Sequence, residues 1–176
     1  SSAPCFVKEG TVAKPASHSM ILPHQLFAAL FEYDRGIFID KLCGGSEDRI
    51  ARFWNEMAGH PAYGQGHPLH LRPDHRTKCI PLSLHGDGVT AIGLAKSWGK
   101  TVDAMSWASV LSKGSTISTQ FMIYIIYWSS IVFEDGRNMW DAFTKKLAWS
   151  FYWLFIGKWP TRDETGASYT AGTHTH

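Results

Sequence analysis

The sequence predicts an α/β fold in which two amino-terminal helices precede a three-stranded, mostly antiparallel sheet, with one long aromatic helix against that sheet. Three patterns predict this arrangement. Apolar residues recur at helical spacing in 26–31 and 50–57, alternate at period two in 80–84 and 102–111, and return to helical spacing in 140–154. The 176 residues, 44% of them hydrophobic, suit one globular domain.

The two amino-terminal helices are predicted from their apolar stripes and from their end signals. The first lies in PHQLFAALFEYD, which starts at Pro23, because proline is favoured in the first turn of a helix. The second follows the Gly44–Gly45 pair, with Ser46 as the N-cap and two acidic residues in the first turn, where they complement the helix dipole. Together they make residues 20–58 a helical segment.

Three strands are predicted between residues 79 and 133. CIPLSLHGDG alternates and then becomes glycine-rich, so the first strand is expected to end in a turn at HGDG. The link 88–101 closes a hairpin onto a second strand, VDAMSWASVL at 102–111. The β-branched and aromatic run FMIYIIYWSSIVF at 121–133 is interpreted as a buried third strand, although a run this short also suits a helix.

The longest helix is predicted to follow, with Asn138 as its N-cap and large apolar residues at spacings of three and four. Segments without periodicity surround the regular elements. Residues 1–19 are expected to form a flexible arm, 59–78 a histidine- and proline-rich linker, 79–160 the core and 161–176 a disordered tail.

Charge, cysteine content and hydropathy restrict the class of protein. A net charge of +2 gives no strongly basic surface, so any contact with DNA has to be local. Three widely spaced cysteines predict free thiols in a reducing compartment, and hence an intracellular protein, nuclear or cytoplasmic. The two long apolar runs fall short of the roughly 20 residues that cross a bilayer, which argues against a membrane and leaves a membrane-associated hairpin as a third alternative.

The feature best suited to chemistry is His85-Gly86-Asp87-Gly88, because glycines on either side of a carboxylate let a ligand and the backbone approach it closely. Asp-Gly is also a common hairpin turn, and spacing alone favours a turn over a metal-binding carboxylate. The sequence therefore leaves both interpretations of Asp87 open.

Two other clusters have a functional and a structural interpretation. Lys96, Trp98 and Lys100 interleave cations with an aromatic ring and could contact nucleic acid, but they also suit a solvated hairpin loop. Imidazole and thiolate groups crowd into 26 residues, yet their spacing fits no zinc finger, so zinc is disfavoured against surface histidines in a proline-rich loop. This second cluster comprises His60, His67, His70, His75, Cys79 and His85.

Four blocks occur together in order: IPLSLHGDGV, KSWGKTVDAMSWASVL, the apolar strand, and FTKKLAWSFYWLFIGKWPTRD. In this order, from about Leu22 to Gly166, the chain resembles a set of transposon-derived proteins of unicellular algae. These are similar in turn to DDE-type transposases with an RNase H-like core. The resemblance covers the amino-terminal half of such a core, and its specificity lies in the joint order of the blocks.

The resemblance implies that Asp87 is the first catalytic carboxylate of a nuclease that uses Mg²⁺. Asp103 opens the second strand across the hairpin from Asp87 and is a further candidate catalytic residue. In such enzymes a cluster of acidic side chains holds two Mg²⁺ ions that activate the attacking oxygen and stabilise the leaving one. The family continues into further acidic residues beyond His176, so the chain is expected to be a catalytically incomplete fragment. Asp103 could form a makeshift carboxylate set with Asp163 and Glu164, but acids after a helix are usually solvated turn residues, which disfavours this set.

The alternative to a nuclease is a non-catalytic protein-interaction module. The aromatic stripe from Trp140 to Phe155 has helical period and is interpreted mainly as core packing. If part of the sheet is missing, however, the same helix face could bind a partner protein.

Overall fold

The computed structural model describes residues 1–64, 66–91, 100–134 and 138–169, with the backbone alone at 89–91 and 100. The fold is mixed α/β, as predicted. The chain divides into two compact units: unit 1 comprises 1–26, 87–104 and 123–176, and unit 2 comprises 27–86 and 105–122. Helix α1 and strands β3, β4 and β5 each contribute residues to both units.

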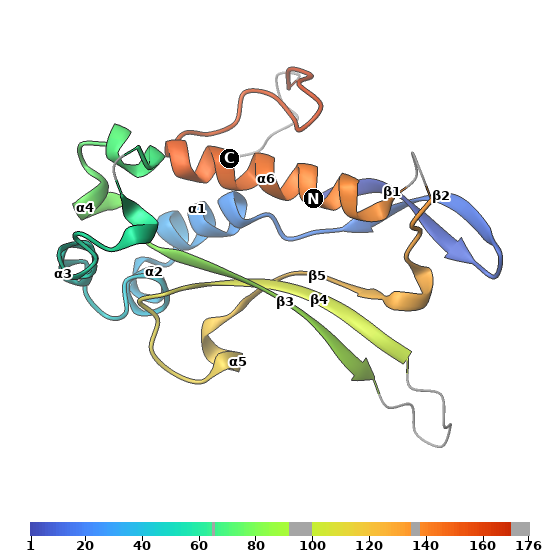
Figure 1. The fold of residues 1–176 in the computed structure, drawn as a ribbon, viewed down its shortest axis with the longest axis horizontal. Coiled ribbons are helices and arrows are strands. Elements are labelled where there is room, and N and C mark those ends of the chain that lie inside the picture. The colour runs from blue at the N-terminus through green and yellow to red at the C-terminus, as the bar shows by residue number, and fades with distance from the viewer. Residues whose placement is uncertain (65, 92–99, 135–137, 170–176) are drawn as a thin grey trace. The chain divides into compact units, whose positions relative to one another are not determined.

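The first 19 residues form a β-hairpin and not the flexible arm that was predicted. Strands β1 (Ser2–Glu9) and β2 (Val12–Ser19) pair antiparallel in full register across a two-residue turn, where Gly10 has a φ of +63°. The hairpin is held because β1 lies along α6, and Val7 forms an isolated bridge with Ile131 (Figure 1). The side chains of β1 that are fully buried, Ala3 and Cys5, are small. The sequence therefore lacks the alternation of large apolar residues that predicts a strand.

Helices α1 (Pro23–Tyr33) and α3 (Asp48–Glu56) confirm the two helices that were predicted. The predicted cap of α3 is wrong by one residue. Glu47 is the N-cap residue and makes no side-chain cap, while the hydroxyl of Ser46 accepts from the backbone N–H of Asp48 at 3.3 Å.

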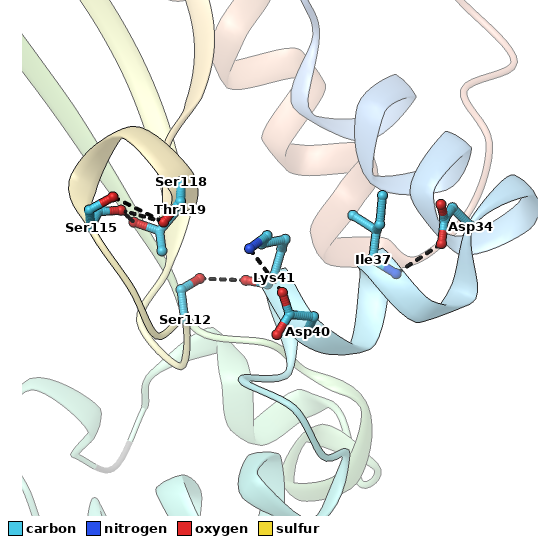
Figure 2. A network of polar contacts seen from close by, with 8 residues as sticks. All are labelled: Asp34, Ile37, Asp40, Lys41, Ser112, Ser115, Ser118 and Thr119. Carbon is cyan, nitrogen blue, oxygen red and sulfur yellow. Dashed lines mark hydrogen bonds and ion pairs between the residues drawn. The ribbon is translucent and has the colours of Figure 1, made fainter.

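A third helix in this part of the chain, α2 (Arg35–Leu42), was not predicted because its apolar residues show almost no helical periodicity. Its first turn is capped by Asp34, whose carboxylate accepts from the N–H of Ile37 at 2.9 Å. At its other end the hydroxyl of Ser112 donates to the carbonyl of Lys41 (Figure 2). A helix leaves backbone N–H groups unpaired at its start and carbonyl groups unpaired at its end, and α2 has a side-chain partner at each end. The partner at the carboxyl end, Ser112, lies 71 residues from Lys41 in the sequence.

The chain after α2 makes a close approach that only glycine permits. Gly44 has a φ of +65°, and a Cβ there would lie 2.1 Å from the carbonyl oxygen of Leu111. The hydroxyl of Ser109 donates to the carbonyl of Leu42 at 2.6 Å in the same region. These contacts join the end of α2 to the end of β4 and to the segment after it, within unit 2.

Residues 59–78 were predicted to be irregular, and they form three short helical turns: η1 (Pro61–Tyr63), η2 (Pro68–Leu71) and α4 (His75–Lys78). Trp54 on α3 anchors the end of this segment, because its indole N–H donates to the carbonyl of Cys79 at 2.7 Å.

The predicted three-stranded antiparallel sheet is confirmed, in the order β3-β4-β5. Strand β3 spans Leu82–Ala91, β4 Lys100–Ser109 and β5 Phe121–Tyr127. The single turn α5 (Thr116–Thr119) precedes β5, and η3 (Trp128–Ser130) follows it, so the third strand is shorter than predicted. Strand β3 does not end at HGDG but continues through it, and the link it makes to β4 lies in 92–99, outside the described residues.

Helix α6 (Met139–Ile156) confirms the long aromatic helix. The side chain of Asn138 caps it as predicted, accepting from the N–H of Trp140 at 3.0 Å, and Gly157 ends it with a φ of +68°. Throughout the described segments, no helix is both long enough and apolar enough to cross a membrane.

Each unit has its own set of buried apolar side chains. In unit 1 these come from β1, β5, α6 and the segments joining them: Ala3, Cys5, Met20, Leu22, Ile123, Tyr124, Ile126, Ile131, Val132, Met139, Phe143 and Leu147. In unit 2 they come from α2, α3, η2, β4 and the residues that directly follow α2 and β4: Phe38, Leu42, Cys43, Ile50, Trp54, Leu69, Trp107 and Leu111.

The segment after α6 was predicted to be disordered, yet residues up to 169 are ordered by specific contacts. Arg162 and Ser168 form an isolated β-bridge, and Lys146 on α6 makes an ion pair of 2.7 Å with Glu164. Because this ion pair is almost fully buried, it ties the segment closely to α6. Residues 170–176 lie outside the described part of the chain.

A buried hydrogen bond joins α1 to α6 inside unit 1. His24 Nδ1 lies 2.8 Å from Ser150 Oγ, and the same hydroxyl accepts from the backbone N–H of His24 at 3.3 Å. Ser150 is fully buried and His24 nearly so, with the indole ring of Trp149 packed edge-on against the imidazole at 5.0 Å. Polar groups this deeply buried are stabilising only while they remain hydrogen-bonded.

We expect Ser150→Ala to lower the free energy of unfolding by about 1–3 kcal/mol, because it removes one partner from polar atoms that stay buried. Urea unfolding measures the change. Thr144→Ala, at an exposed position of the same helix, is the control and should change stability by less than about 0.5 kcal/mol. Equal effects of the two substitutions would contradict this role for Ser150.

Candidate functional site on strand β3

Asp87 lies within strand β3, where residues 83–88 are all exposed. The glycines beside it leave room for side chains of the neighbouring strand β4. A Cβ at Gly86 would lie 3.2 Å from Met105 Cε, and one at Gly88 would lie 3.5 Å from Thr101 Cγ2. The interpretation of HGDG as a turn is therefore wrong, and Asp87 is carried by an extended strand.

Alternation along the two strands separates Asp87 from Asp103. The contacts of Gly86 with Met105 and of Gly88 with Thr101 show that these four residues share one face of the ladder. Asp103 lies between Thr101 and Met105 at period two, so it belongs to that face. Asp87, between the two glycines, projects from the opposite face.

The two carboxylates nevertheless interact electrostatically. Asp103 is half-buried, and burial, with the negative charge of Asp87 as the second cause, raises the pKa of its carboxyl group. Burial likewise raises the pKa of the Tyr124 hydroxyl on β5, with the charge of Asp103 as a smaller contribution. Asp103 therefore sits in a less polar environment than the exposed Asp87, next to a buried phenol.

The other acidic residues considered for a metal site have structural partners. Glu164 is paired with Lys146. The Asp163 carboxylate accepts hydrogen bonds from the Thr165 hydroxyl and from the backbone N–H groups of Thr165 and Ala167. The hydroxyl bond is the main cause that lowers the pKa of Asp163, and the backbone bonds add to it. Among the residues that the structure describes, no three His, Cys, Asp or Glu side chains come together as a metal site requires.

The histidines of 59–78 stabilise turns through hydrogen bonds to the backbone. His60 and His67 each precede a proline, and the Nδ1 atom of each accepts from the N–H two residues later, at 3.2 Å and 3.1 Å. Each is thus the N-cap of a 3₁₀ helix that has proline in its first turn. The ring nitrogens of His70 and His75 bond to the carbonyls of Tyr63 and Arg72.

The predicted contacts with nucleic acid or protein are only partly visible. Lys96 and Trp98 fall outside the described residues, and Lys100 begins β4 with its side chain not described. On α6 the aromatic stripe packs in the core as far as Leu147, but its last turns are more open. Tyr152 and Phe155 on these turns are exposed, as is Trp159, which follows the helix.

Two features were not found from the sequence, since both depend on tertiary contacts. The first is the His24–Ser150 pair, which has the atoms of a nucleophile and its base. Ser150 is fully buried and out of reach of any substrate, so this pair is structural. The second is Trp107, whose indole N–H is buried without a hydrogen-bond partner within the described part of the chain.

Comparisons with protein-family models, with curated proteins and with solved structures gave no match.

Asp103→Asn should stabilise the fold at neutral pH. Because the folded-state pKa of Asp103 is raised, its contribution to stability is present below the pKa of an exposed aspartate, about 3.9, and is lost as the pH rises through the folded-state value. The asparagine variant should therefore unfold at a higher temperature than the wild type near neutral pH, with the difference vanishing in acid. Thermal unfolding across the pH range tests this, with Asp40→Asn as an exposed control.

Replacing His67 by alanine should cost about 1 kcal/mol of unfolding free energy, whereas asparagine should largely retain the cap, because its side chain also accepts from the helix amide. Thermal unfolding with added Zn²⁺ or with a chelator distinguishes a capping role of His67 from a role as a metal ligand. We expect neither addition to move the midpoint. A Zn²⁺-dependent rise that His67→Ala abolishes would instead identify a zinc site.

Proposed function

We propose that β3, β4, β5 and α6 are the first part of an RNase H-like nuclease core of the transposase type, in which Asp87 is the first carboxylate ligand for Mg²⁺. The observation that carries the proposal is Asp87 itself: an exposed carboxylate between two glycines on an outer strand of a three-stranded antiparallel sheet that is followed by a long helix. The order of sequence blocks around it supports the same proposal.

The chemistry of Asp87 suits this role. An exposed aspartate offers two hard oxygen ligands to Mg²⁺, which prefers to keep several of its waters and to bind through one or two carboxylates. The neighbouring glycines leave no side chains that would crowd a phosphodiester beside the carboxylate. Asp103, half-buried on the opposite face, is a less suitable ligand, and in this proposal it acts on the site only through its charge.

A single carboxylate does not complete a two-metal active site. In this proposal Asp87 is one member of a larger set of ligands, and we expect the 176-residue chain to bind Mg²⁺ weakly and not to cleave DNA by itself. Any contact with DNA would come from the segment that contains Lys96, Trp98 and Lys100, since the net charge of the chain is only +2.

Binding at Asp87 can be tested with Mn²⁺, which takes similar oxygen ligands and broadens nearby NMR signals. We expect Mn²⁺ to broaden the amide signals of Gly86 and Gly88 first, and Asp87→Asn to abolish that broadening. Asp40→Asn, at an exposed carboxylate on α2, is the matched control and should leave it unchanged.

Two outcomes would count against the proposal. Broadening spread evenly over exposed carboxylates, with no preference for residues near Asp87, would mean that Asp87 is an ordinary surface acid. Cleavage of DNA that depends on Mg²⁺ and is lost in Asp87→Asn would support a nuclease but contradict the proposed incompleteness of the chain.

A second candidate function, a non-catalytic protein-interaction module, is favoured by the exposed aromatic side chains near the end of α6. Tyr152 is 57% exposed, Trp159 44% and Phe155 39%, so three large aromatic side chains within residues 152–159 are accessible to a partner. If this surface is the functional one, Tyr152→Ser with Phe155→Ser should abolish a complex of defined stoichiometry while leaving the effect of Mn²⁺ at Asp87 unchanged.

A further inference from the structure

Strand β3 is an outer strand with an edge that is open in the described sheet. Its one sheet neighbour among the described strands is β4, and residues 83–88 are exposed throughout. Proteins usually protect such an edge with lysine, proline or a bulge. LSLHGDG contains neither lysine nor proline, and Asp87 is its one acidic residue.

The direction of the backbone groups of β3 follows from its pairing with β4. The carbonyl of Pro81 accepts from the N–H of Val110 at 2.9 Å, so residue 81 directs its backbone toward β4. Gly86 lies opposite Met105 in the same register. Because backbone groups alternate along a strand, Leu84, Gly86 and Gly88 direct their N–H and C=O groups toward the open edge.

The side chains along this edge are self-complementary about Gly86. His85 and Asp87 are its two immediate neighbours, one able to donate a hydrogen bond from its ring and the other a carboxylate acceptor. In an antiparallel pair of identical strands centred on Gly86, each His85 stands opposite Asp87 of the second copy. The strand is thus complementary to itself in hydrogen bonding.

We propose that β3 is a homodimerisation edge: two copies of this chain pair their β3 strands antiparallel about a two-fold axis at Gly86, with two reciprocal His85–Asp87 pairs. Gly86 then exchanges backbone hydrogen bonds with Gly86 of the second copy, and Leu84 does so with Gly88. The His85–Asp87 pairs occupy non-hydrogen-bonded positions, where Cα atoms are about 4.5 Å apart and opposing side chains are closest.

The adjacent registers are less favourable. Centring the pair on Asp87 sets two carboxylates directly opposite each other, and like charges in that position are destabilising. Centring it on His85 places two imidazoles together and leaves each Asp87 opposite Ser83. In the proposed register the exposed side chain of Leu84 also lies beside Gly88 of the second copy, where no side chain obstructs it.

A dimer formed through one strand buries less surface than a standard stable interface, so we expect a dissociation constant on the order of 10–1000 µM. Sedimentation velocity from about 10 µM to 1 mM would detect it. A dimer of the His85→Asp variant would place two carboxylates opposite each other at both of the His85–Asp87 pairs. A dimer of the Asp87→His variant would place two imidazoles opposite each other at both pairs. Each should weaken self-association at least tenfold.

A mixture of the two variants provides the decisive result. His85→Asp chains and Asp87→His chains restore both donor–acceptor pairs only when they pair with each other, so the equimolar mixture should recover a heterodimer that neither variant forms alone. Glu32→His makes the same change of charge at an exposed position of α1 and should leave the wild-type dimer intact.

Hydrogen exchange of the wild-type chain gives a readout that needs no variant. The amides of Leu84, Gly86 and Gly88 should gain protection as the concentration rises, whereas those of Ser83 and His85, directed toward β4, should not change. A chain that stays monomeric to 1 mM, a dimer equally stable in both single variants, or uniform protection along β3 would overturn the inference. The inference does not rest on the proposed nuclease role, because hydrogen exchange is measured without a metal ion and reports the pairing of β3 whether or not Asp87 binds Mn²⁺.

Discussion

The buried hydrogen bond between His24 and Ser150 is the constraint on which unit 1 depends. An imidazole surrounded by apolar and aromatic side chains is tolerated only with a hydrogen-bond partner, and Ser150 lies 126 residues away in the sequence. Forming the bond brings the start of α1 to the middle of α6. Strand β1 packs beside the same helix, and this packing, with the bridge between Val7 and Ile131, keeps the first 19 residues ordered.

A similar requirement governs unit 2. Helix α2 has little amphipathic character, and it is stabilised by the groups that satisfy its ends: the carboxylate of Asp34 at the start and the hydroxyls of Ser109 and Ser112 at the finish. Gly44 then lets the backbone pass against the carbonyl of Leu111. In both units, therefore, polar groups and backbone carbonyls select partners far along the chain, while apolar burial supplies most of the driving force.

Strand β3 is less covered than the other two strands of its sheet, and both functional inferences arise from that difference. Its side chains are exposed over residues 83–88, whereas β4 and β5 contribute residues such as Trp107 and Ile123 to the buried cores. Asp87 is consequently available either to a metal ion or to a second chain. Asp103 is not equivalent to it, because it lies on the other face of the ladder and its ionised form is disfavoured by burial.

The sequence by itself determined the elements whose signals are local: α1, α3, α6 with its Asn138 cap, and the three strands of the sheet in their order along the chain. In each, hydrophobic periodicity and end residues agree with the final structure. Only the tertiary structure decided the β1–β2 hairpin, helix α2, and the path of β3 through HGDG. These depend on contacts with Ile131, Ser112 and Met105, residues distant in sequence, and a glycine-rich segment carries no local information that distinguishes a strand from a turn until its neighbour across the ladder is known.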